Sequence, residues 1–396
     1  MRYSYLIFFF GRMKLNFTQN ELIRYSRQML LPDLKEEGQL KLKQSSVLVI
    51  GAGGLGSAAL YYLCAAGVGR IGLLDFDVIE ESNLQRQILY QTSDIGSDKS
   101  KKAAERLHGL NPNVAIESYT ILLDSNNALD VISHYDVILD GSDNLPTRYL
   151  VSDACVLLDK TLIYGAIFQF EGQVSVFNQL LKNGSRGPNY RDLYPKPPPP
   201  EMVTSCSVGG VLGVLPGIIG SMQASEAIKV LTNMGTTLNG RLMIFDALDF
   251  TMRFLNIRAN PDNPVSGSNP TIKELIDYEI FCNSSLGNGE EMAIKEISPL
   301  EVMSLLEKSA IQLIDVREPF EFELINIAGL NIPLNFIREN ITLIEKIRPV
   351  VVHCKSGQRS AQAVRLLNQL GFDNVTNMHG GLLQWKKEVD PTIRMY

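Results

Sequence analysis

SVLVIGAGGLG, residues 46–56, joins an apolar strand to a helix through a glycine-rich turn. The strand, Ser46 to Ile50, is nearly continuous in apolar residues, which is typical of a strand buried on both faces of a parallel sheet. Gly51, Gly53 and Gly56 then follow in the G-x-G-x-x-G spacing. Backbone N–H groups at the start of the next helix can bind phosphate. We expect a nucleotide site here, with NAD, FAD and ATP all open, and a purely structural glycine turn as the alternative.

Strands and helices alternate around this turn. A capping box, Thr18 with Glu21, begins an early helix. Further strands are expected at 70–75, 114–119 and 136–140, with helices at 57–66, 99–109 and 222–231 and a hairpin-like pair at 241–246 and 253–257. This alternation predicts an α/β fold with a Rossmann-like, doubly wound, mostly parallel sheet.

A second, smaller α/β unit is expected after a change in composition. Prolines and small polar residues over 261–292 indicate a linker. Beyond it we expect a helix at 299–308 and strands at 312–316 and 350–353. The predicted organisation is therefore an extension at 1–14, in which residues 1–12 are expected to be disordered and to precede the functional start, a first domain at 15–260, the linker, and a second domain at 293–396.

Composition excludes several classes of protein. The chain has 396 residues, is 45% hydrophobic and carries a net charge of -6, which gives no general footprint for nucleic acid. The apolar run Leu6 to Phe10 is too short for a signal peptide or a membrane span. The five cysteines form no C-x-x-C pair, so we expect no disulfide framework. This fits a protein of the reducing cytoplasm.

Charged residues at the carboxyl ends of the expected strands distinguish among nucleotides. Asp75 and Asp77 follow one strand, Arg86 and Lys99 come shortly after, and Asp143 follows a later strand. Ligands bind at this edge of doubly wound sheets. Hydride transfer needs little positive charge, whereas a triphosphate needs cations and a magnesium ligand. The pattern favours ATP with Mg²⁺ over NAD.

The first domain resembles the MoeB/ThiF family, which is related to ubiquitin-activating enzymes. The matching stretches are Arg24 to Gln28, Gly51 to Gly56, Asp75 to Asp77, Asn83 to Gln87, Asp143-Asn144 and Glu171 to Gln173. The resemblance implies adenylation of the C-terminal Gly-Gly of a ubiquitin-like sulfur carrier such as MoaD or ThiS. It implies a cofactor site of Gly51, Gly53, Gly54, Gly56, Asp75, Asp77, Asn83, Arg86, Lys99 and Asp143.

The resemblance also implies individual roles. Gly54 and Asp75 would hold adenosine and ribose, Arg86 and Lys99 the phosphates, and Asp143 the Mg²⁺. Arg27 would reach the nucleotide of the partner subunit in a homodimer. A carboxylate nucleophile is already ionised at neutral pH, so no general base is needed and cations can carry the catalysis.

The cysteines of the family are matched only in part. Cys206 matches a family cysteine with a covalent role toward the carrier, although a small buried cysteine is the alternative. The family's two C-x-x-C pairs, which bind zinc, match Asn189 to Asp192 and Asn263 to Ser266 here, and neither contains cysteine. We therefore expect no zinc.

The second domain places a thiol between a strand and a helix. Cys354-Lys355-Ser356-Gly357-Gln358-Arg359 follows the apolar strand at 350–353. Backbone N–H groups and Arg359 are expected to face the sulfur and to favour a thiolate. Four residues separate Cys354 from Arg359, one fewer than in cysteine phosphatases, which suits a persulfide better than a phosphate.

This loop resembles that of the rhodanese family. Asp315 to Glu321, Asn331 to Leu334 and Gly380 to Trp385 match its other motifs. The resemblance implies a persulfide on Cys354 and a rhodanese fold for the second α/β domain.

Together the domains predict adenylation of a sulfur carrier followed by sulfur transfer toward a carrier thiocarboxylate. The expected catalytic residues are Arg27, Arg86, Lys99, Asp143, Cys206 and Cys354. The sulfur donor, a cysteine desulfurase or thiosulfate, stays open, as does the carrier pathway. An NAD-dependent oxidoreductase and a non-catalytic scaffold for a ubiquitin-like partner are the alternatives.

Overall fold

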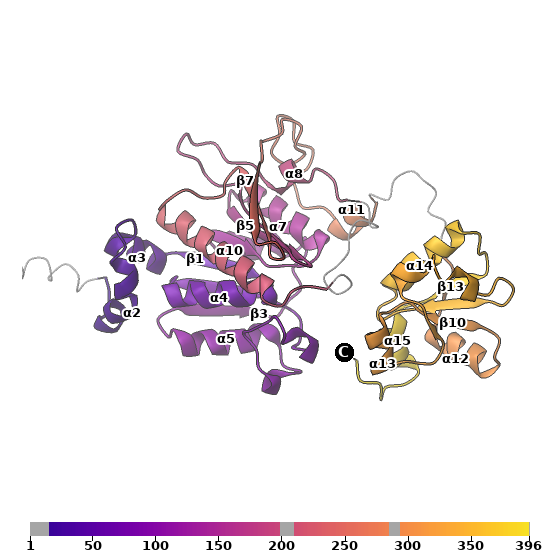
Figure 1. Ribbon diagram of the computed structural model, residues 1–396. Coiled ribbons are helices and arrows are strands. Elements are labelled where there is room, and N and C mark those ends of the chain that lie inside the picture. Colours follow the sequence, from indigo (N-terminus) through magenta and orange to yellow (C-terminus); the bar gives the residue numbers. More distant parts are fainter. Residues whose placement is uncertain (1–15, 199–209, 285–293, 396) are drawn as a thin grey trace, which may run out of the picture. The chain divides into compact units, whose positions relative to one another are not determined.

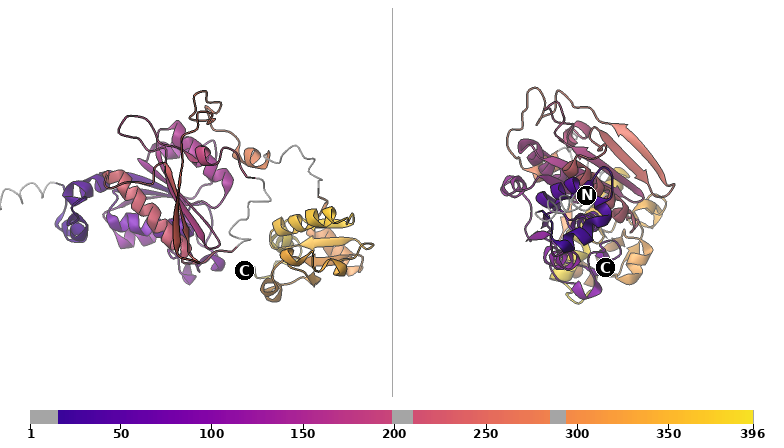
Figure 2. Two further views of the ribbon diagram at one scale, coloured as in Figure 1. Left: turned by 45° about the horizontal axis from the view of Figure 1, so that its top comes forward. Right: turned by 90° about the vertical axis from the view of Figure 1, so that its left-hand side faces the viewer.

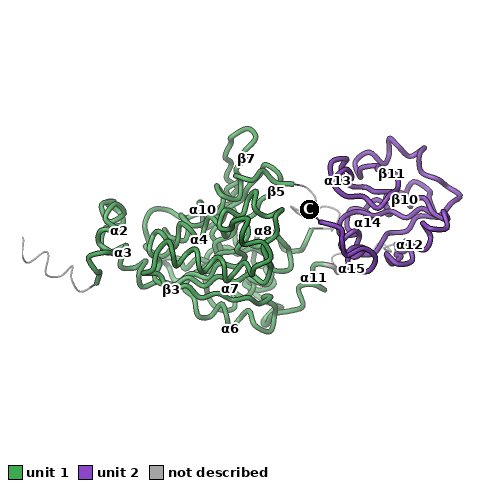
Figure 3. Tube along the Cα trace, turned by 90° about the horizontal axis from the view of Figure 1, so that it is seen from below, with its two compact units in different colours: residues 1–285 green, residues 286–396 purple. Residues whose placement is uncertain are grey.

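The computed structural model describes residues 16–198, 210–284 and 294–395. The chain divides into two compact units, Met1–Ser285 and Leu286–Tyr396, which Figure 3 distinguishes by colour. The first holds an eight-stranded sheet and the second a five-stranded sheet. The extension predicted at 1–14 lies outside the described residues.

The sheet of the first unit has the order β3-β2-β1-β4-β5-β6-β7-β8. The strands are β1 (Ser46–Ile50), β2 (Arg70–Leu74), β3 (Ala115–Tyr119), β4 (Val137–Asp140), β5 (Thr161–Phe168), β6 (Glu171–Phe177), β7 (Arg241–Asp246) and β8 (Thr251–Asn256). Strands β1 to β5 pair in parallel, and β6 to β8 continue the sheet in antiparallel fashion. This confirms the predicted Rossmann-like, mostly parallel sheet.

Helices cover both faces of this sheet (Figures 1 and 2). They are α2 (Gln19–Met29), α3 (Lys35–Gln44), α4 (Gly54–Ala66), α5 (Lys99–Leu110), α6 (Ala128–Ser133), α7 (Leu145–Leu157), α8 (Tyr190–Leu193), α10 (Leu215–Thr232) and α11 (Tyr278–Ser284). Alternate residues of β1 enter different cores: Val47 and Val49 pack with α4 and α10, and Leu48 and Ile50 pack with α6 and α7. Side chains of a strand alternate in direction, so an apolar run supplies both cores.

Helix α10 is longer than its sequence predicts. The expected helix at 222–231 begins at Leu215, with Pro216 in its first turn and Gly217 and Gly220 inside it. Glycine weakens an isolated helix. Here, however, a Cβ on Gly220 would lie 2.2 Å from the carbonyl oxygen of Leu55 in α4. Close packing of α10 against α4 therefore needs glycine at this position.

The first half of the expected linker packs on the first unit. Tyr278 and Cys282 of α11 are buried, and the Tyr278 hydroxyl donates to the Asp153 carboxylate at 2.8 Å. Asp153 also accepts two bonds from Arg191, at 2.8 and 2.7 Å. The Arg191 guanidinium lies near the ring of Phe281 in α11, 4.7 Å from its centroid. Residues 261–284 thus differ from the expected linker, because a buried ion pair and aromatic contacts fix α11.

The four positions that match the family's cysteine pairs come together and are joined by hydrogen bonds. The Asn263 side-chain amide donates to Asn189 Oδ1 at 3.0 Å and to Asp192 Oδ1 at 2.8 Å. The Asn189 amide donates to the Ser266 hydroxyl at 2.7 Å. Asn189 and Asn263 are buried. A neutral and acidic polar cluster thus joins the segments at 189–192 and 263–266.

The second unit has the strand order β11-β10-β12-β13-β9, all parallel. The strands are β9 (Glu296–Ile297), β10 (Gln312–Asp315), β11 (Leu330–Asn331), β12 (Val350–His353) and β13 (Val375–Met378). The helices are α12 (Pro299–Glu307), α13 (Pro319–Leu324), α14 (Gln358–Gln369) and α15 (Gly381–Glu388). Cores on the two faces of the sheet include Val352 on one side and Val351 with Trp385 on the other. The predicted smaller α/β fold is confirmed.

A buried histidine lies beneath the loop that follows β12. His353 is fully buried, and neither ring nitrogen has a hydrogen-bond partner. Its Nε2 lies 3.8 Å from the Asp315 carboxylate, which is itself bound by the buried Arg317. Burial lowers the pKa of His353 to about 4.

Replacing Asn263 with alanine should destabilise the first unit by about 1–3 kcal/mol, since the acceptor oxygens of Asn189 and Asp192 lose the amide donor of Asn263. The midpoint of urea unfolding measures the effect. Ser268→Ala, an exposed serine of the same loop, is the matched control. An Asn263→Ala protein as stable as the control would show that the cluster does not hold the two segments.

The second unit should lose stability as the pH falls from 6.5 to about 4. The unfolded chain binds a proton on His353 in this window and the folded chain does not, so acid favours unfolding, by on the order of 3 kcal/mol at most. Trp385, the only tryptophan of the chain, reports the unfolding of this unit by its fluorescence. His353→Gln should flatten the pH dependence relative to the wild type, and an unchanged slope would contradict the role of His353.

Candidate active sites

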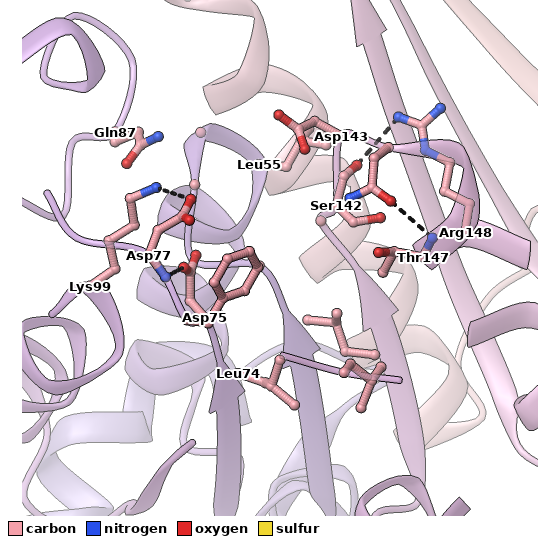
Figure 4. Close-up of a pocket in the computed structure, with 18 of the residues that line it drawn as sticks. Leu55, Leu74, Asp75, Asp77, Gln87, Lys99, Ser142, Asp143, Thr147 and Arg148 are labelled. Atoms are coloured by element: carbon pink, nitrogen blue, oxygen red, sulfur yellow. Dashed lines mark hydrogen bonds and ion pairs between the residues drawn. The ribbon is translucent and has the colours of Figure 1, made fainter. Parts of the chain in front are cut away.

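A cavity opens where the order of the first sheet reverses, between β1 and β4. Strand β1 has β2 on one side and β4 on the other, and ligands bind at such a switch point. The cavity is lined by residues from the turn after β1, the ends of β2 and β4, and the first turns of α4, α5 and α7. Figure 4 shows these side chains converging from two sides.

Glycines make the floor of this cavity possible. Gly51 has a φ of +87°, and a Cβ on it would lie 2.9 Å from the carbonyl oxygen of Gly141. A Cβ on Gly56 would lie 1.9 Å from the carbonyl oxygen of Gly51. Only glycine fits both approaches. The start of α4 therefore lies at the cavity, which Gly53, Gly54 and Leu55 line, and the first N–H groups of a helix can bind an anion.

Acidic residues and a lysine occupy one side of the cavity. The Asp75 carboxylate accepts from the backbone N–H of Ala52 at 2.8 Å and of Asp77 at 2.9 Å. Burial raises the pKa of Asp75, and Lys99 and these hydrogen bonds oppose the shift. The buried Lys99 ammonium lies 2.8 Å from the Asp77 carboxylate. This pair holds a positive charge at the cavity wall.

The remaining predicted residues divide into those that line the cavity and those that do not. Arg86 lines it, with Nη1 donating to the carbonyl of Ser82 at 3.0 Å, and Asp143 lines it from the loop after β4. The cavity brings together Gly51, Gly53, Gly54, Asp75, Asp77, Arg86, Lys99 and Asp143.

Gly56, Asn83 and Arg27 are not among the described residues that line the cavity. Gly56 serves the turn, and the Asn83 side chain caps a 3-10 helix by accepting from the Glu80 N–H. Arg27 is exposed on α2. Cys206 lies outside the described residues.

The cavity is also lined by residues that the sequence motifs do not predict. They are Gln87, Ser142, Thr147 and Arg148, with apolar Leu122, Leu123 and Ile167. Thr147 and Arg148 belong to the first turn of α7, which begins after the cap residue Asn144. A helix that starts beside a ligand loop directs its first turn toward the ligand. The Asn-x-x-Thr cap pattern was the available signal.

The second site lies at the end of β12, in the other unit. Cys354 is buried, and its sulfur accepts the backbone N–H of Gly357 at 3.1 Å and the hydroxyl of Ser360 at 3.4 Å. Gly357 has a φ of +90°, which aims its N–H back into the loop. Ser360 was not predicted. The thiol is therefore held by neutral donors from its own loop and from the first turn of α14.

Arg359 is engaged by a carboxylate. Its Nη2 donates to Glu321 of α13 at 2.7 Å, and Nη1 contacts the second oxygen of the same carboxylate at 2.5 Å. Both side chains are nearly buried. From the sequence we expect Arg359 to face the sulfur. The structure shows a bidentate ion pair that ties the loop to α13, and the donors observed at the sulfur are the Gly357 N–H and the Ser360 hydroxyl.

None of the helices in the described part of the chain is long and apolar enough to cross a lipid bilayer.

Comparison with known proteins identifies both units. Residues 25–265 match the ThiF family, and residues 298–388 match the rhodanese-like domain. The chain is 44% identical over 384 residues to the probable adenylyltransferase/sulfurtransferase MoeZ of Mycobacterium tuberculosis, covering 96% of each chain. It is 53% identical over 268 residues to a sulfur carrier protein adenylyltransferase of Thermus thermophilus, covering 68% of this chain and 99% of that one.

Among solved structures, Escherichia coli MccB with AMPCPP and MccA is similar, with a TM-score of 0.55 and 19% identity over 64% of this chain and 76% of that one. At this identity the likeness shows the fold alone. The ThiF match covers more than half of the chain, and MoeZ resembles it over nearly its whole length. The chain therefore belongs to the ThiF family, carries a C-terminal rhodanese-like domain, and is an enzyme of the adenylyltransferase and sulfurtransferase class that uses ATP.

Proposed function

We propose that the first unit adenylates the C-terminal glycine of a ubiquitin-like sulfur carrier and that the second unit supplies sulfur from Cys354. The observation that supports this most directly is one cavity with Arg86, Lys99 and Asp143 around a glycine turn, in the same chain as a thiol loop. The family assignment decides against an NAD-dependent oxidoreductase and against a non-catalytic scaffold.

The first step joins two anions. The carrier carboxylate attacks the α-phosphorus of ATP, the bond to the β-phosphate oxygen breaks, and acyl-adenylate and pyrophosphate form. No proton has to be removed from the nucleophile. Catalysis then depends on holding both reactants and on neutralising negative charge as it develops on the phosphates.

The residues of the cavity suit this step. Asp75, at the end of β2, is placed to accept from the ribose hydroxyls while it stays anchored by two backbone N–H groups. Arg86 and Lys99 are the cations for the phosphates. Lys99 starts paired with Asp77, so it is positioned before ATP binds.

Asp143 is the candidate for Mg²⁺. It is exposed in the cavity, and the described residues contain no group of three or more metal-ligating side chains. Mg²⁺ is commonly held by one or two carboxylates together with substrate phosphates and water, so a single carboxylate fits this ion. Bound there, Mg²⁺ would supply positive charge to the triphosphate.

The second step forms a carbon–sulfur bond. A persulfide on Cys354 attacks the acyl carbon of the adenylate, AMP leaves, and an acyl disulfide joins the carrier to Cys354. A second thiol then attacks the Cys354 sulfur, which releases the carrier thiocarboxylate and leaves a disulfide. Cys206 is the candidate for this thiol in the chain. Two equivalents of a cellular thiol must afterwards reduce this disulfide and are themselves oxidised to a disulfide.

Partners follow from this chemistry. The carrier ends in Gly-Gly, and the sulfur donor is a cysteine desulfurase or thiosulfate.

Arg27 lies away from the cavity of its own chain, on α2, which fits a homodimer in which it reaches the nucleotide of the partner subunit. A cytoplasmic location agrees with free cysteines at positions 64, 155, 282 and 354.

Lys99→Ala should reduce the rate of adenylation by roughly 10²- to 10³-fold, because a preorganised cation is lost from the phosphate side. Pyrophosphate release with Mg-ATP and a Gly-Gly carrier measures it. Lys101→Gln on the same helix removes an exposed positive charge and should leave the rate within twofold. Equal rates for Lys99→Ala and Lys101→Gln would exclude Lys99 from the site.

Cys354→Ala should keep adenylation and abolish sulfur transfer, because the thiol lies in the other unit. MoaD-like and ThiS-like carriers would each be incubated with Mg-ATP and thiosulfate, or with a cysteine desulfurase and cysteine. Mass spectrometry then shows whether one carrier oxygen has been replaced by sulfur, and which carrier and donor are used. Sulfur incorporation by Cys354→Ala would contradict the division of labour, and an adenylate without sulfur in the wild type would remove the second unit from the reaction.

A further inference from the structure

Arg148 carries a positive charge that the structure does not neutralise by a direct bond. Its Nε is buried without a hydrogen-bond partner, and its Nη2 donates to the carbonyl oxygen of Ser142 at 3.3 Å. That distance is long for a charged donor, which usually approaches to 2.7–2.9 Å. Among the described residues, no carboxylate forms an ion pair with Arg148.

Among the described residues, each buried arginine is paired with a carboxylate. Arg191 makes two short bonds to Asp153, and Arg317 is bound to Asp315. An enclosed guanidinium without such a partner is costly. Asp140, at the end of β4, and Asp143, on the loop after β4, attract Arg148 without bonding to it. Burial raises the pKa of the Asp140 carboxyl, so Asp140 is a weaker counter-charge than an exposed aspartate. The Arg148 guanidinium therefore has no bonded carboxylate among the described residues and can bind an anionic ligand in the cavity.

The position of Arg148 indicates which anion this is. Arg148 lines the same cavity as Lys99, and Figure 4 shows the two on opposite sides of it. Arg86 belongs with the glycine turn, since a Cβ on Gly54 would lie 3.6 Å from its Cγ. The phosphates of ATP thus have two cations on one side. Arg148 lies instead beside Tyr164 of β5, 5.9 Å from its ring centroid.

We propose that Arg148 binds the C-terminal carboxylate of the polypeptide that this site adenylates. The inference rests on the proposed function, and it assigns the second anion of the reaction its own cation. The planar guanidinium can bind both carboxylate oxygens and so orient one of them toward the α-phosphorus. Without this cation, the carboxylate would approach a triphosphate against electrostatic repulsion.

The charge of the carboxylate disappears when the acyl-adenylate forms. Arg148 therefore binds the reactant more strongly than the product, and its contribution lies mainly in binding the carrier. A residue of this kind changes KM more than kcat. A cation for the phosphates would instead change the affinity for ATP.

The test compares Arg148→Gln and Arg148→Lys with the wild type and with Lys182→Gln, which removes one exposed positive charge. ATP affinity is measured without carrier, and KM and kcat for a MoaD-like carrier are measured by pyrophosphate release. We expect Arg148→Gln to raise the carrier KM about 10- to 100-fold with ATP affinity within twofold of the wild type. Arg148→Lys should recover part of the loss, and all variants should melt like the wild type.

A carrier with an amidated terminal glycine separates this inference from the proposed function. The wild type should bind the free acid more tightly than the amide, and Arg148→Gln should bind both equally. A fall in ATP affinity with unchanged carrier KM would assign Arg148 to the phosphates and overturn the proposal, as would equal binding of acid and amide by the wild type. Discrimination between acid and amide without any pyrophosphate release would support Arg148 and contradict the adenylation.

Discussion

The turn after β1 and the loop after β4 touch, and the first active site depends on this contact. The Gly51 N–H donates to the last carbonyl of β2, and the Gly141 N–H donates to the last carbonyl of β1, each at 2.8 Å. Between the two backbones there is no room for a side chain on Gly51. The ends of three strands are thereby held level, so that charges far apart in sequence open into one cavity. A larger residue at Gly51 would push the turn after β1 away from the loop that carries Asp143, and a larger residue at Gly56 would disrupt the turn itself.

The two sites differ in the charge of the groups around the ligand or the sulfur. The first lines one cavity with cations and carboxylates, and one of the cations, Lys99, is paired with the Asp77 carboxylate. The second surrounds a sulfur with neutral donors, Gly357 and Ser360, and ties its nearby arginine to Glu321. A triphosphate needs charge compensation, whereas a sulfur nucleophile must stay reactive. Placing the two sites on separate units of one chain raises the local concentration of the donor near the acceptor.

Hydrogen bonds and a buried ion pair hold distant segments of the first unit together. The cluster of Asn189, Asp192, Asn263 and Ser266 joins two segments that lie far apart in the sequence. The buried pair of Arg191 and Asp153 holds α8 to α7, and Tyr278 extends it to α11. Breaking such a buried ion pair costs free energy, so α11 stays packed against the first unit.

The sequence by itself determined the fold class, the nucleotide turn and the thiol loop, because these depend on short-range patterns. Few other local structures fit an apolar strand that is followed by glycines in fixed spacing, or by the loop of Cys354. Eight of the ten predicted nucleotide residues line one cavity for the same reason, since strand ends in a parallel sheet share an edge. The sequence did not reveal the start of α10 at Leu215, the packing of 261–284, the ion pair of Arg359 or the position of Arg148. Each of these depends on packing against another element: α10 against Leu55, α11 against Asp153, Arg359 against Glu321, and Arg148 against Tyr164 of β5. Only the tertiary structure decides such contacts, because local propensity carries no information about which buried charge or backbone lies opposite.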